Sequence, residues 1–378
     1  MSGAPATRPH LDSTQRSDWL RLMRSENVGP VTFRLLLNRY GSAQSALDAL
    51  PELSARGGLP RRVTVATREE ADRELEAVAK LGARMVAPGE TGYPPLLAQT
   101  DASPPLLAVM GDYDAAHHPC IGIVGSRNAS AAGLKIARMF ASELAEAGCT
   151  VVSGLARGID AAAHEASLDR GTIAVLAGGL ANIYPQQNRP LAANIIGAGL
   201  LISEMPVSHG PRAQDFPRRN RIISGCCHAI IVVEAAKRSG SLITARLAAE
   251  QNRDVFAVPG SILDPRADGT NALIRKGATL VTAASQVIEA IEPQLDRWER
   301  QPGQQLTLDE VAIAMPEAPE DPELGTRIIR LLSAAPIDFD TLCREARAPA
   351  GQTAGAILEL ELAGRIMRHP GNRLSRND

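Results

Sequence analysis

Glycine, serine and arginine follow several short apolar runs of this sequence, in positions where they could hold an anion. The first set, Gly125-Ser126-Arg127, comes directly after the run Ile121-Gly-Ile-Val124. Glycine lets a ligand approach the backbone closely, and arginine supplies a fixed positive fork for phosphate oxygens. We therefore predict an anion-binding loop here, with a tight turn that only happens to contain arginine as the alternative. The glycine spacing differs from G-x-G-x-x-G, so no dinucleotide site is predicted.

The same kinds of residue recur in three later segments. The further candidates for nucleic-acid contacts are Gly154, Arg157, Phe216, Arg218, Arg219, Asn220, Arg221, Ser239, Gly240 and Ser241. Three arginines and an asparagine within 218–221 suit phosphate oxygens, and Phe216 or Tyr184 could stack one base. The hydroxyl groups within 239–241 could surround an anion with donors. A solvated basic face and simple helix capping are the alternatives for these segments.

These segments do not carry the groups that most enzymes use. Paired carboxylates, metal-ligand clusters and a Ser/His/Asp set are missing near the cationic residues, so we predict no catalytic residue, no metal and no cofactor. His164 lacks an evident nucleophile to activate and is predicted to be structural. Asp160 is predicted to cap a helix.

The elements that must position these residues form an α/β pattern from about residue 85 to 291. Apolar β-branched runs without alternation are separated by helical stretches, which predicts a parallel sheet covered on both faces. The loops after the strand ends then share one edge, where ligands of such sheets bind. We place this domain at 85–295, after a helical domain at 1–84 and before a linker at 296–320.

Two smaller domains are predicted on either side of the sheet. In the first, a break at Asn27-Val-Gly-Pro30 separates two helical stretches, which fits a helix-hairpin-helix whose turn binds phosphate or an ordinary helical hairpin. Residues 321–378 read as helix, helix, longer helix and strand, which suggests a winged helix. Acidic and basic residues balance there, so a protein contact is at least as plausible as DNA reading.

Composition narrows the classes of function. The chain has 378 residues, a formal charge of −2 and only 3% aromatic residues, so a nucleic-acid role needs a local basic patch rather than overall charge or rows of stacked bases. The 5 cysteines show no C-x-x-C spacing, which favours free thiols in a reducing cytoplasm. No apolar run approaches the length of a membrane span.

The motifs also resemble a known family. Gly125-Ser-Arg127, Ser153-Gly-Leu-Ala-x-Gly-Ile-Asp160, Phe216-Pro-x-Arg-Asn-Arg221, Ser239-Gly-Ser-Leu-Ile-Thr-Ala245 and Gly269-Thr-Asn271 are similar to the signature series of DNA-processing protein A, the DprA or Smf family. The resemblance implies an extended Rossmann-like fold, flanked by a helical N-terminal domain and a C-terminal winged helix.

The resemblance further implies a function. Members of this family bind single-stranded DNA and deliver it to the RecA recombinase during natural transformation. Their DNA contacts correspond here to the residues of the Gly-Ser-Arg and Phe-Pro-x-Arg-Asn-Arg loops, and their homodimer contacts to Ile274 and Leu280. The alternatives are a nucleotide-processing enzyme of the LOG phosphoribohydrolase type and an adaptor whose DNA site is vestigial. The LOG-type Pro-Gly-Gly-x-Gly-Thr loop is missing at 239–245.

Overall fold

The structure is a computed structural model that describes residues 10–300, 321–369 and 371–377. The chain divides into two compact units. The sheet unit contains His10 and residues 76–300 of the described chain, and the terminal unit contains residues 11–75 and 321–377. The terminal unit therefore combines residues from the N-terminal and the C-terminal parts of the chain, whereas two separate flanking domains were expected. The residue limits given above for the domains stay a prediction.

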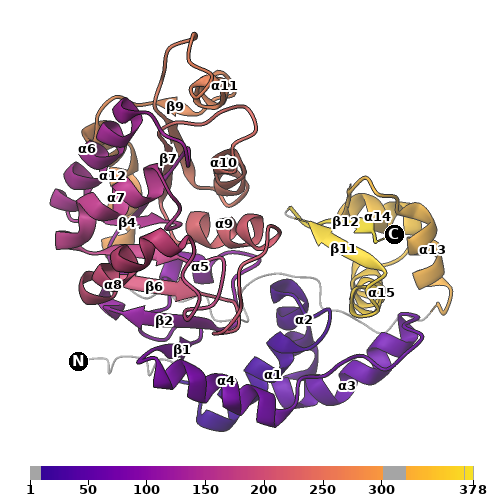
Figure 1. The fold of residues 1–378 in the computed structure, drawn as a ribbon. Coiled ribbons are helices and arrows are strands. Elements are labelled where there is room, and N and C mark those ends of the chain that lie inside the picture. The colour runs from indigo at the N-terminus through magenta and orange to yellow at the C-terminus, as the bar shows by residue number, and fades with distance from the viewer. Residues whose placement is uncertain (1–9, 301–320, 370, 378) are drawn as a thin grey trace, which may run out of the picture. The chain divides into compact units, whose positions relative to one another are not determined.

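A nine-stranded sheet organises the sheet unit (Figure 1). Its strands are β1 (Arg84–Val86), β2 (Leu107–Gly111), β3 (Cys120–Val124), β4 (Thr150–Ser153), β5 (Thr172–Val175), β6 (Leu200–Ser203), β7 (Ala229–Val232), β8 (Asp254–Ala257) and β9 (Thr279–Leu280). The spatial order is β1-β2-β6-β5-β4-β3-β7-β8-β9. From β6 to β9 all neighbours are parallel, as predicted. The chain thus winds outward from β3 in one direction and then restarts on its other side with β7.

The sequence did not reveal the antiparallel edge of this sheet. β2 pairs antiparallel with β6, with Val109 opposite Ile202, and β1 pairs antiparallel with β2. β1 has only three residues, whereas β2, with five, is as long as β3. The helix that follows β1, Pro95–Ala98, has only four residues, and β2 is followed only by a 3-10 helix of five residues, Tyr113–His117. Neither strand therefore shows the alternation with long helical segments that identified the parallel strands.

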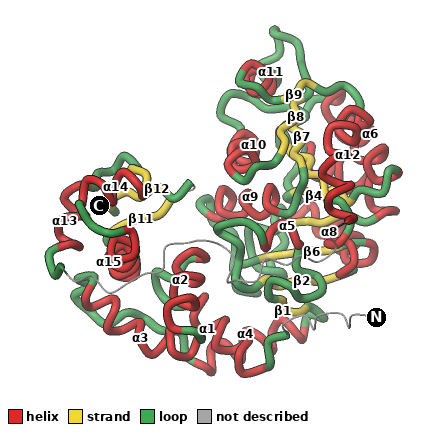
Figure 2. Tube along the Cα trace, turned by 180° about the vertical axis from the view of Figure 1, so that it is seen from behind, coloured by secondary structure: helices red, strands yellow, loops and turns green. Residues whose placement is uncertain are grey.

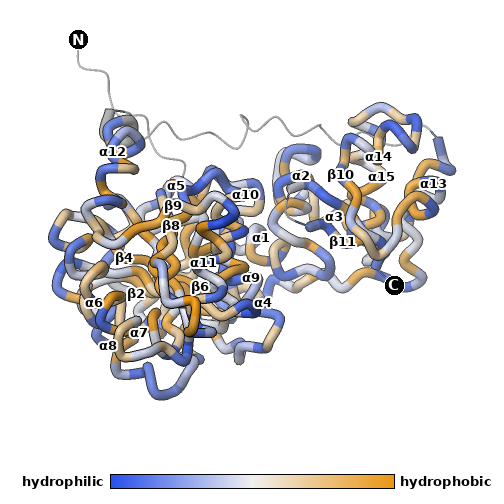
Figure 3. Tube along the Cα trace, turned by 90° about the horizontal axis from the view of Figure 1, so that it is seen from above, coloured by the Kyte–Doolittle hydropathy of each residue, from blue (hydrophilic) through white to orange (hydrophobic). Residues whose placement is uncertain are grey.

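Helices cover both faces of the sheet (Figure 2). They are α5 (Pro95–Ala98), α6 (Ala131–Glu146), α7 (Ile159–Ser167), α8 (Arg189–Ala198), α9 (Asp215–Gly225), α10 (Ser241–Glu250), α11 (Asp268–Arg275) and α12 (Ala284–Arg300), with short 3-10 helices at Tyr113–His117, Leu168–Arg170 and Gln186–Asn188. α6, α7 and α12 pack their apolar residues on one face, and α5, α9 and α10 on the other. Figure 3 shows the hydrophobic residues concentrated along the strands between these layers.

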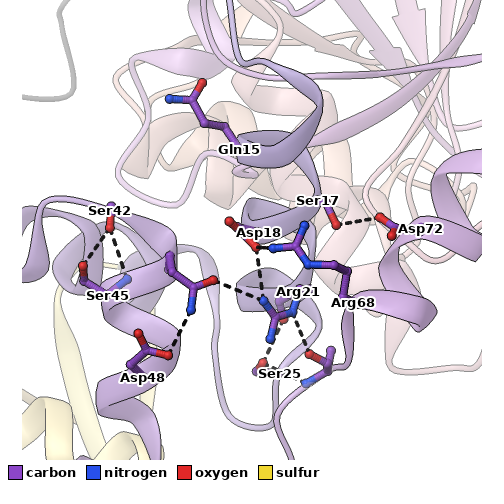
Figure 4. A network of polar contacts seen from close by, with 12 residues as sticks. Gln15, Ser17, Asp18, Arg21, Ser25, Ser42, Ser45, Asp48, Arg68 and Asp72 are labelled. Atoms are coloured by element: carbon purple, nitrogen blue, oxygen red, sulfur yellow. Dashed lines mark hydrogen bonds and ion pairs between the residues drawn. The ribbon is translucent and has the colours of Figure 1, made fainter.

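Four helices form the N-terminal part of the terminal unit: α1 (Ser13–Arg24), α2 (Pro30–Tyr40), α3 (Ala43–Arg56) and the first part of α4 (Arg68–Lys80). Leucines of α1, α2 and α3 share one core with Phe33. A polar network ties α1 to α4 (Figure 4): the buried Asp18 carboxylate accepts from Arg21 at 3.1 Å and from Arg68 at 2.8 Å, and Ser17 donates to Asp72 at 2.7 Å. The predicted helical hairpin is confirmed, with Gly29 at the N-cap of α2.

The C-terminal part of the terminal unit has the elements of a winged helix, as predicted. They are α13 (Leu324–Leu331), β10 (Ile337–Asp338), α14 (Phe339–Ala346), α15 (Ala350–Leu362), β11 (Ile366–His369) and β12 (Arg373–Arg376), and the strands form a small antiparallel sheet. The linker was predicted at 296–320. Its first positions, 296–300, belong to α12, and the remainder, 301–320, lies outside the described residues. Across the described ranges, the structure has no helix that is long and apolar enough to span a membrane.

Candidate functional site

Three loops meet at the point where the strand order reverses. β3 lies between β4 and β7, so the loops that follow these strands are neighbours at the carboxyl edge of the sheet. The backbones approach too closely for side chains at two glycines. A Cβ at Gly125 would stand 2.6 Å from Cγ1 of Ile159, and a Cβ at Gly158 would stand 2.3 Å from the carbonyl oxygen of Ser126. Gly158 also has a φ of +76°, which favours glycine.

An acidic residue that sequence reasoning missed fixes the first loop. The Glu234 carboxylate, just after β7, accepts the backbone N–H of Ser130 at 2.9 Å and also bonds the Ser130 hydroxyl. Ser130 in turn caps α6 by accepting from the N–H of Gly133 at 2.9 Å. The only signal in the sequence was an acidic residue at the end of an apolar run. The loop that carries Ser126 and Arg127 is therefore held at both of its ends.

The basic cluster at 216–221 was expected to be a loop, but it forms the first two turns of α9. Helical periodicity separates its side chains, because residues three or four apart share a face. Phe216, Arg219 and Asn220 therefore face the switch-point loops. Arg218 and Arg221 turn to the buried Glu204, to which Arg218 donates at 2.8 Å and Arg221 forms a second ion pair.

Arg219 lies underneath the site rather than on its surface. Only 5% of it is exposed, and it donates to the carbonyl oxygens of Gly154, at 2.6 Å, and Val175. Burial lowers the pKa of the Arg219 guanidinium to about 10, against the opposing effect of Asp160. Burial likewise raises the pKa of the Asp160 carboxyl, which Arg219 opposes. This arginine joins the ends of β4 and β5 through its two carbonyl partners.

A hollow opens above Arg219. It is lined by Arg127, Gly154, Ala156, Arg157, Leu176, Ala177, Gly178, Asn182, Tyr184, Pro185, Phe216 and Arg219. The guanidinium carbon of Arg127 lies 5.0 Å from the centre of the Phe216 ring, which lies 5.7 Å from the Tyr184 ring. Arg127 and Arg157 are exposed. None of the described lining residues is a carboxylate, cysteine or histidine, so the hollow is suited to an anion with a planar group.

Five of the predicted contact residues thus come together in this hollow: Arg127, Gly154, Arg157, Phe216 and Arg219. Gly125 and Ser126 support it from the adjoining loop. The structure does not bring Arg218 or Arg221 to it, because Glu204 binds both. Nor do Asn220 and the segment 239–241 line it.

Asn220 and the segment 239–241 form a separate contact. Asn220 is buried, and its amide donates to the carbonyl oxygen of Gly240 at 3.3 Å. The hydroxyls of Ser239 and Ser241 lie 2.7 Å apart and bond each other. Ser241 does not occupy the N-cap position of α10, which belongs to Gly240. In this structure the segment is a neighbour of α9 rather than part of the hollow.

Two residues of α7, His164 and Asp160, have structural roles. His164 is fully buried on α7, its Nδ1 lies 2.9 Å from the Thr172 hydroxyl, and burial lowers its pKa to about 3, so it is neutral and structural as predicted. The prediction that Asp160 is an N-cap is wrong, because that position is Gly158. The Asp160 carboxylate instead accepts from the N–H groups of Gly154, at 3.1 Å, and Ala156, closing the preceding loop.

Apolar side chains are exposed after β8. Ile262 and Leu263 are each 88% exposed, Leu280 is 48% exposed, and Ile274 is partly buried.

The five cysteines are free thiols. Burial raises the pKa of Cys120 to about 12, so it remains protonated. No group of His, Cys, Asp and Glu able to hold a metal is found among the residues that the structure describes.

Fold and site together define a Rossmann-like protein whose sheet edge presents arginine and aromatic side chains, with a helical domain and a winged helix at its ends. Family models match the same three parts of the chain. Residues 84–292 match DNA recombination-mediator protein A, residues 13–77 match the DprA-like N-terminal HHH domain, and residues 312–372 match the DprA winged helix domain. The chain belongs to the DprA family.

Individual relatives agree with this assignment. Protein Smf of Escherichia coli (strain K12) is 36% identical over 360 residues, which cover 93% of this chain and 94% of that protein. The X-ray structure of DprA from Streptococcus pneumoniae matches with a TM-score of 0.59 and 35% identity, over 72% of this chain and 95% of that one. A structure of DNA processing protein A from Helicobacter pylori, described as giving insights into its single-stranded DNA binding mode, matches with a TM-score of 0.51 and 28% identity, over 56% and 96%.

Proposed function

We propose that the chain binds single-stranded DNA in the hollow above Arg219 and passes it to the RecA recombinase in natural transformation, without catalysing a reaction. The observation that carries this proposal is the meeting of two exposed arginines with two aromatic rings in one hollow that has no described acidic lining residue. Arginine binds phosphate oxygens through its fork of N–H donors, and aromatic rings stack bases regardless of sequence.

The geometry favours a single strand over a duplex. Tyr184 is 53% exposed and its ring lies 5.7 Å from that of Phe216, and these rings can stack a base only when a face of that base is open. In a single strand the bases are already free to turn outward, whereas a duplex would have to unpair. The H. pylori relative is described as binding single-stranded DNA, which supports the same substrate here.

Affinity for an oligonucleotide tests the DNA-binding proposal. At about 150 mM salt each lost phosphate contact costs about 0.8 kcal/mol on counterion release alone, since the salt slope is about 0.7 per contact. We expect Arg127→Ala with Arg157→Ala to weaken binding of a labelled oligothymidine about 15-fold and to reduce the slope of log K against log[salt] by about 1.4. Fluorescence anisotropy measures both.

Arg170→Ala is the matched control, because Arg170 is an exposed arginine that precedes β5 and so belongs to the opposite edge of the sheet. It should leave the affinity and the salt slope unchanged. Equal losses for this control and for the double variant would reject the hollow as the DNA site. Binding of a duplex as tightly as of the single strand would reject the proposed substrate.

The RecA step and the homodimer are parts of the proposal with their own tests. RecA loading predicts faster RecA ATP hydrolysis on DNA already covered by a single-strand-binding protein, and no acceleration would leave only DNA binding. The exposed apolar side chains of Leu280, Ile262 and Leu263 support self-association through the segment after β8. Sedimentation of the full chain tests whether it is a dimer.

A further inference from the structure

The helix α15 occupies a special place in the winged helix. It follows α14 after a short turn and precedes the strands β11 and β12, so it is the second helix of the helix-turn-helix. In DNA-binding proteins of this architecture, the second helix lies in the major groove and contacts base edges with its exposed side chains. Such a helix needs an open face with donors or cations.

After its first turn (350–352), which is at least partly exposed and carries no cation, α15 has no such face. All its residues from 353 to 362 are buried, and its sequence, AGQTAGAILELEL, contains neither lysine nor arginine. One side packs into the core of the winged helix, where Ile357 contacts the cluster that contains Ile328 and Leu342. The other side carries Leu358 and Leu362 into the core of the N-terminal helical domain. The helix is therefore covered on both sides by parts of the same unit.

The approach between α3 and α15 is close enough to exclude a side chain. Gly57, at the end of α3, lies so near α15 that a Cβ there would stand 1.9 Å from the carbonyl oxygen of Glu359 and 2.9 Å from Cβ of Ala363. Gly57 has ordinary right-handed helical angles, with a φ of −67°, so its own backbone does not require glycine. The contact with α15 alone explains the absence of a side chain at this position.

One ion pair and one hydrogen bond cross this interface. Nε of Arg56 lies 3.2 Å from Oε1 of Glu359, and the amide of Asn27 donates to the carbonyl oxygen of Leu362 at 3.0 Å. Asn27 begins the hairpin turn of the N-terminal domain, the turn that could have bound phosphate. Two residues further along α15, Glu361 binds Arg368 of β11 through two hydrogen bonds, at 2.8 and 3.0 Å. Both carboxylates are paired with arginines, and neither offers a donor or a cation to DNA.

We propose that α15 is the binding face for the chain's own N-terminal helical domain, and that it does not read a DNA duplex. The two terminal domains then act as one module in which the elements best suited to DNA, the hairpin turn and the second helix of the helix-turn-helix, face each other. A partner of the winged helix must use another surface. The DNA site proposed in the sheet unit does not depend on this inference.

Hydrogen exchange of the full chain tests the proposal. Gly57→Ala adds one methyl group at the contact and favours the helical backbone otherwise. We expect it to accelerate amide exchange in peptides of α15 at least tenfold, while peptides of β3, β4 and β7 keep their protection. Gly325→Ala is the matched control, because it makes the same change in α13 with nothing within 4 Å of the new Cβ. It should leave exchange in α15 unchanged.

A charge exchange separates loosening of the contact from failure to fold. Arg56→Glu should accelerate exchange in α15, and the double variant with Glu359→Arg should recover part of the protection. Equal exchange in Gly57→Ala and Gly325→Ala would overturn the proposal, as would the absence of any recovery in the reversed pair. Protection of α15 by an added DNA duplex, with simultaneous exposure of the N-terminal domain, would overturn it as well and assign the helix to DNA.

Discussion

Replacing Arg219 by alanine tests whether this side chain holds the site together rather than binding a ligand. Its guanidinium donates to the carbonyl oxygens of Gly154 and Val175 and stands within electrostatic reach of the buried Asp160. Alanine would leave two buried carbonyl groups without this donor and a buried carboxyl without its cation. The ends of β4 and β5 would lose the group that joins them.

The expected cost is large for a single substitution. A hydrogen bond from a charged donor contributes about 1.5–3 kcal/mol, and removing one partner of buried charges costs about 3–5 kcal/mol. We expect a loss of about 4 kcal/mol in the free energy of unfolding, or roughly 10 °C in the melting temperature of a unit of this size. Arg218→Ala is the neighbouring control, because 48% of that side chain is exposed, and it should cost less than about 1 kcal/mol.

Urea unfolding followed by circular dichroism measures these losses. Asp160→Asn in the Arg219→Ala background should recover part of the lost stability, because the uncompensated carboxyl is gone, whereas independent residues would show additive losses. A variant Arg219→Ala that unfolds like the wild type and loses only DNA affinity would refute the structural role and make Arg219 a surface ligand.

Three further outcomes are expected. Burial lowers the pKa of His164 to about 3, so below pH 6.5 the unfolded chain takes up a proton at this residue while the native chain does not. The free energy of unfolding should therefore decrease as the pH is lowered, by about 2 kcal/mol from this residue between about pH 7 and pH 5. His164→Met should abolish that part in urea titrations. Gly158→Ala should displace the loop that carries Ser126 and lower the affinity for an oligonucleotide. Gly148→Ala is the control, because Gly148 also has a positive φ, +83°, but nothing lies within 4 Å of the added Cβ. Equal oligonucleotide affinities of the two variants would contradict the clash at Gly158. Leu280→Lys should convert a dimer to monomers in sedimentation without changing the hollow, and an unchanged mass would exclude this residue from the interface.

The sequence carried most of the information about the parallel sheet. Runs such as Thr150–Ser153 and Ala229–Val232 are apolar on both faces, and each is followed by a helix, so their strands and layer could be predicted. The antiparallel strands β1 and β2 lack that signal. The pairing of α15 with α3 also escaped prediction, because contacts between residues more than 300 positions apart leave no local pattern.

For the site, residue types were predictable and side-chain directions were not. Arg127 and Phe216 come together as the shared edge of the sheet implies. The arginines at 218 and 221 do not join them, because a helix rather than a loop carries the cluster and places them toward Glu204. Glu204 pairs with both arginines from 14 and 17 residues away, and Glu234 holds Ser130 from 104 residues away. An acidic residue after a strand does not reveal its partner.

The shared core of the terminal unit has a consequence for shortened forms of the chain. Leu358 and Leu362 cover leucines of α2 and α3, so a chain cut after α12 would leave those leucines in contact with water. A chain lacking its first helices would in turn strip the cover from α15. The two terminal domains therefore depend on each other for stability. Truncation at either terminus is expected to expose apolar surface and produce an aggregation-prone protein rather than to remove one domain without effect on the other.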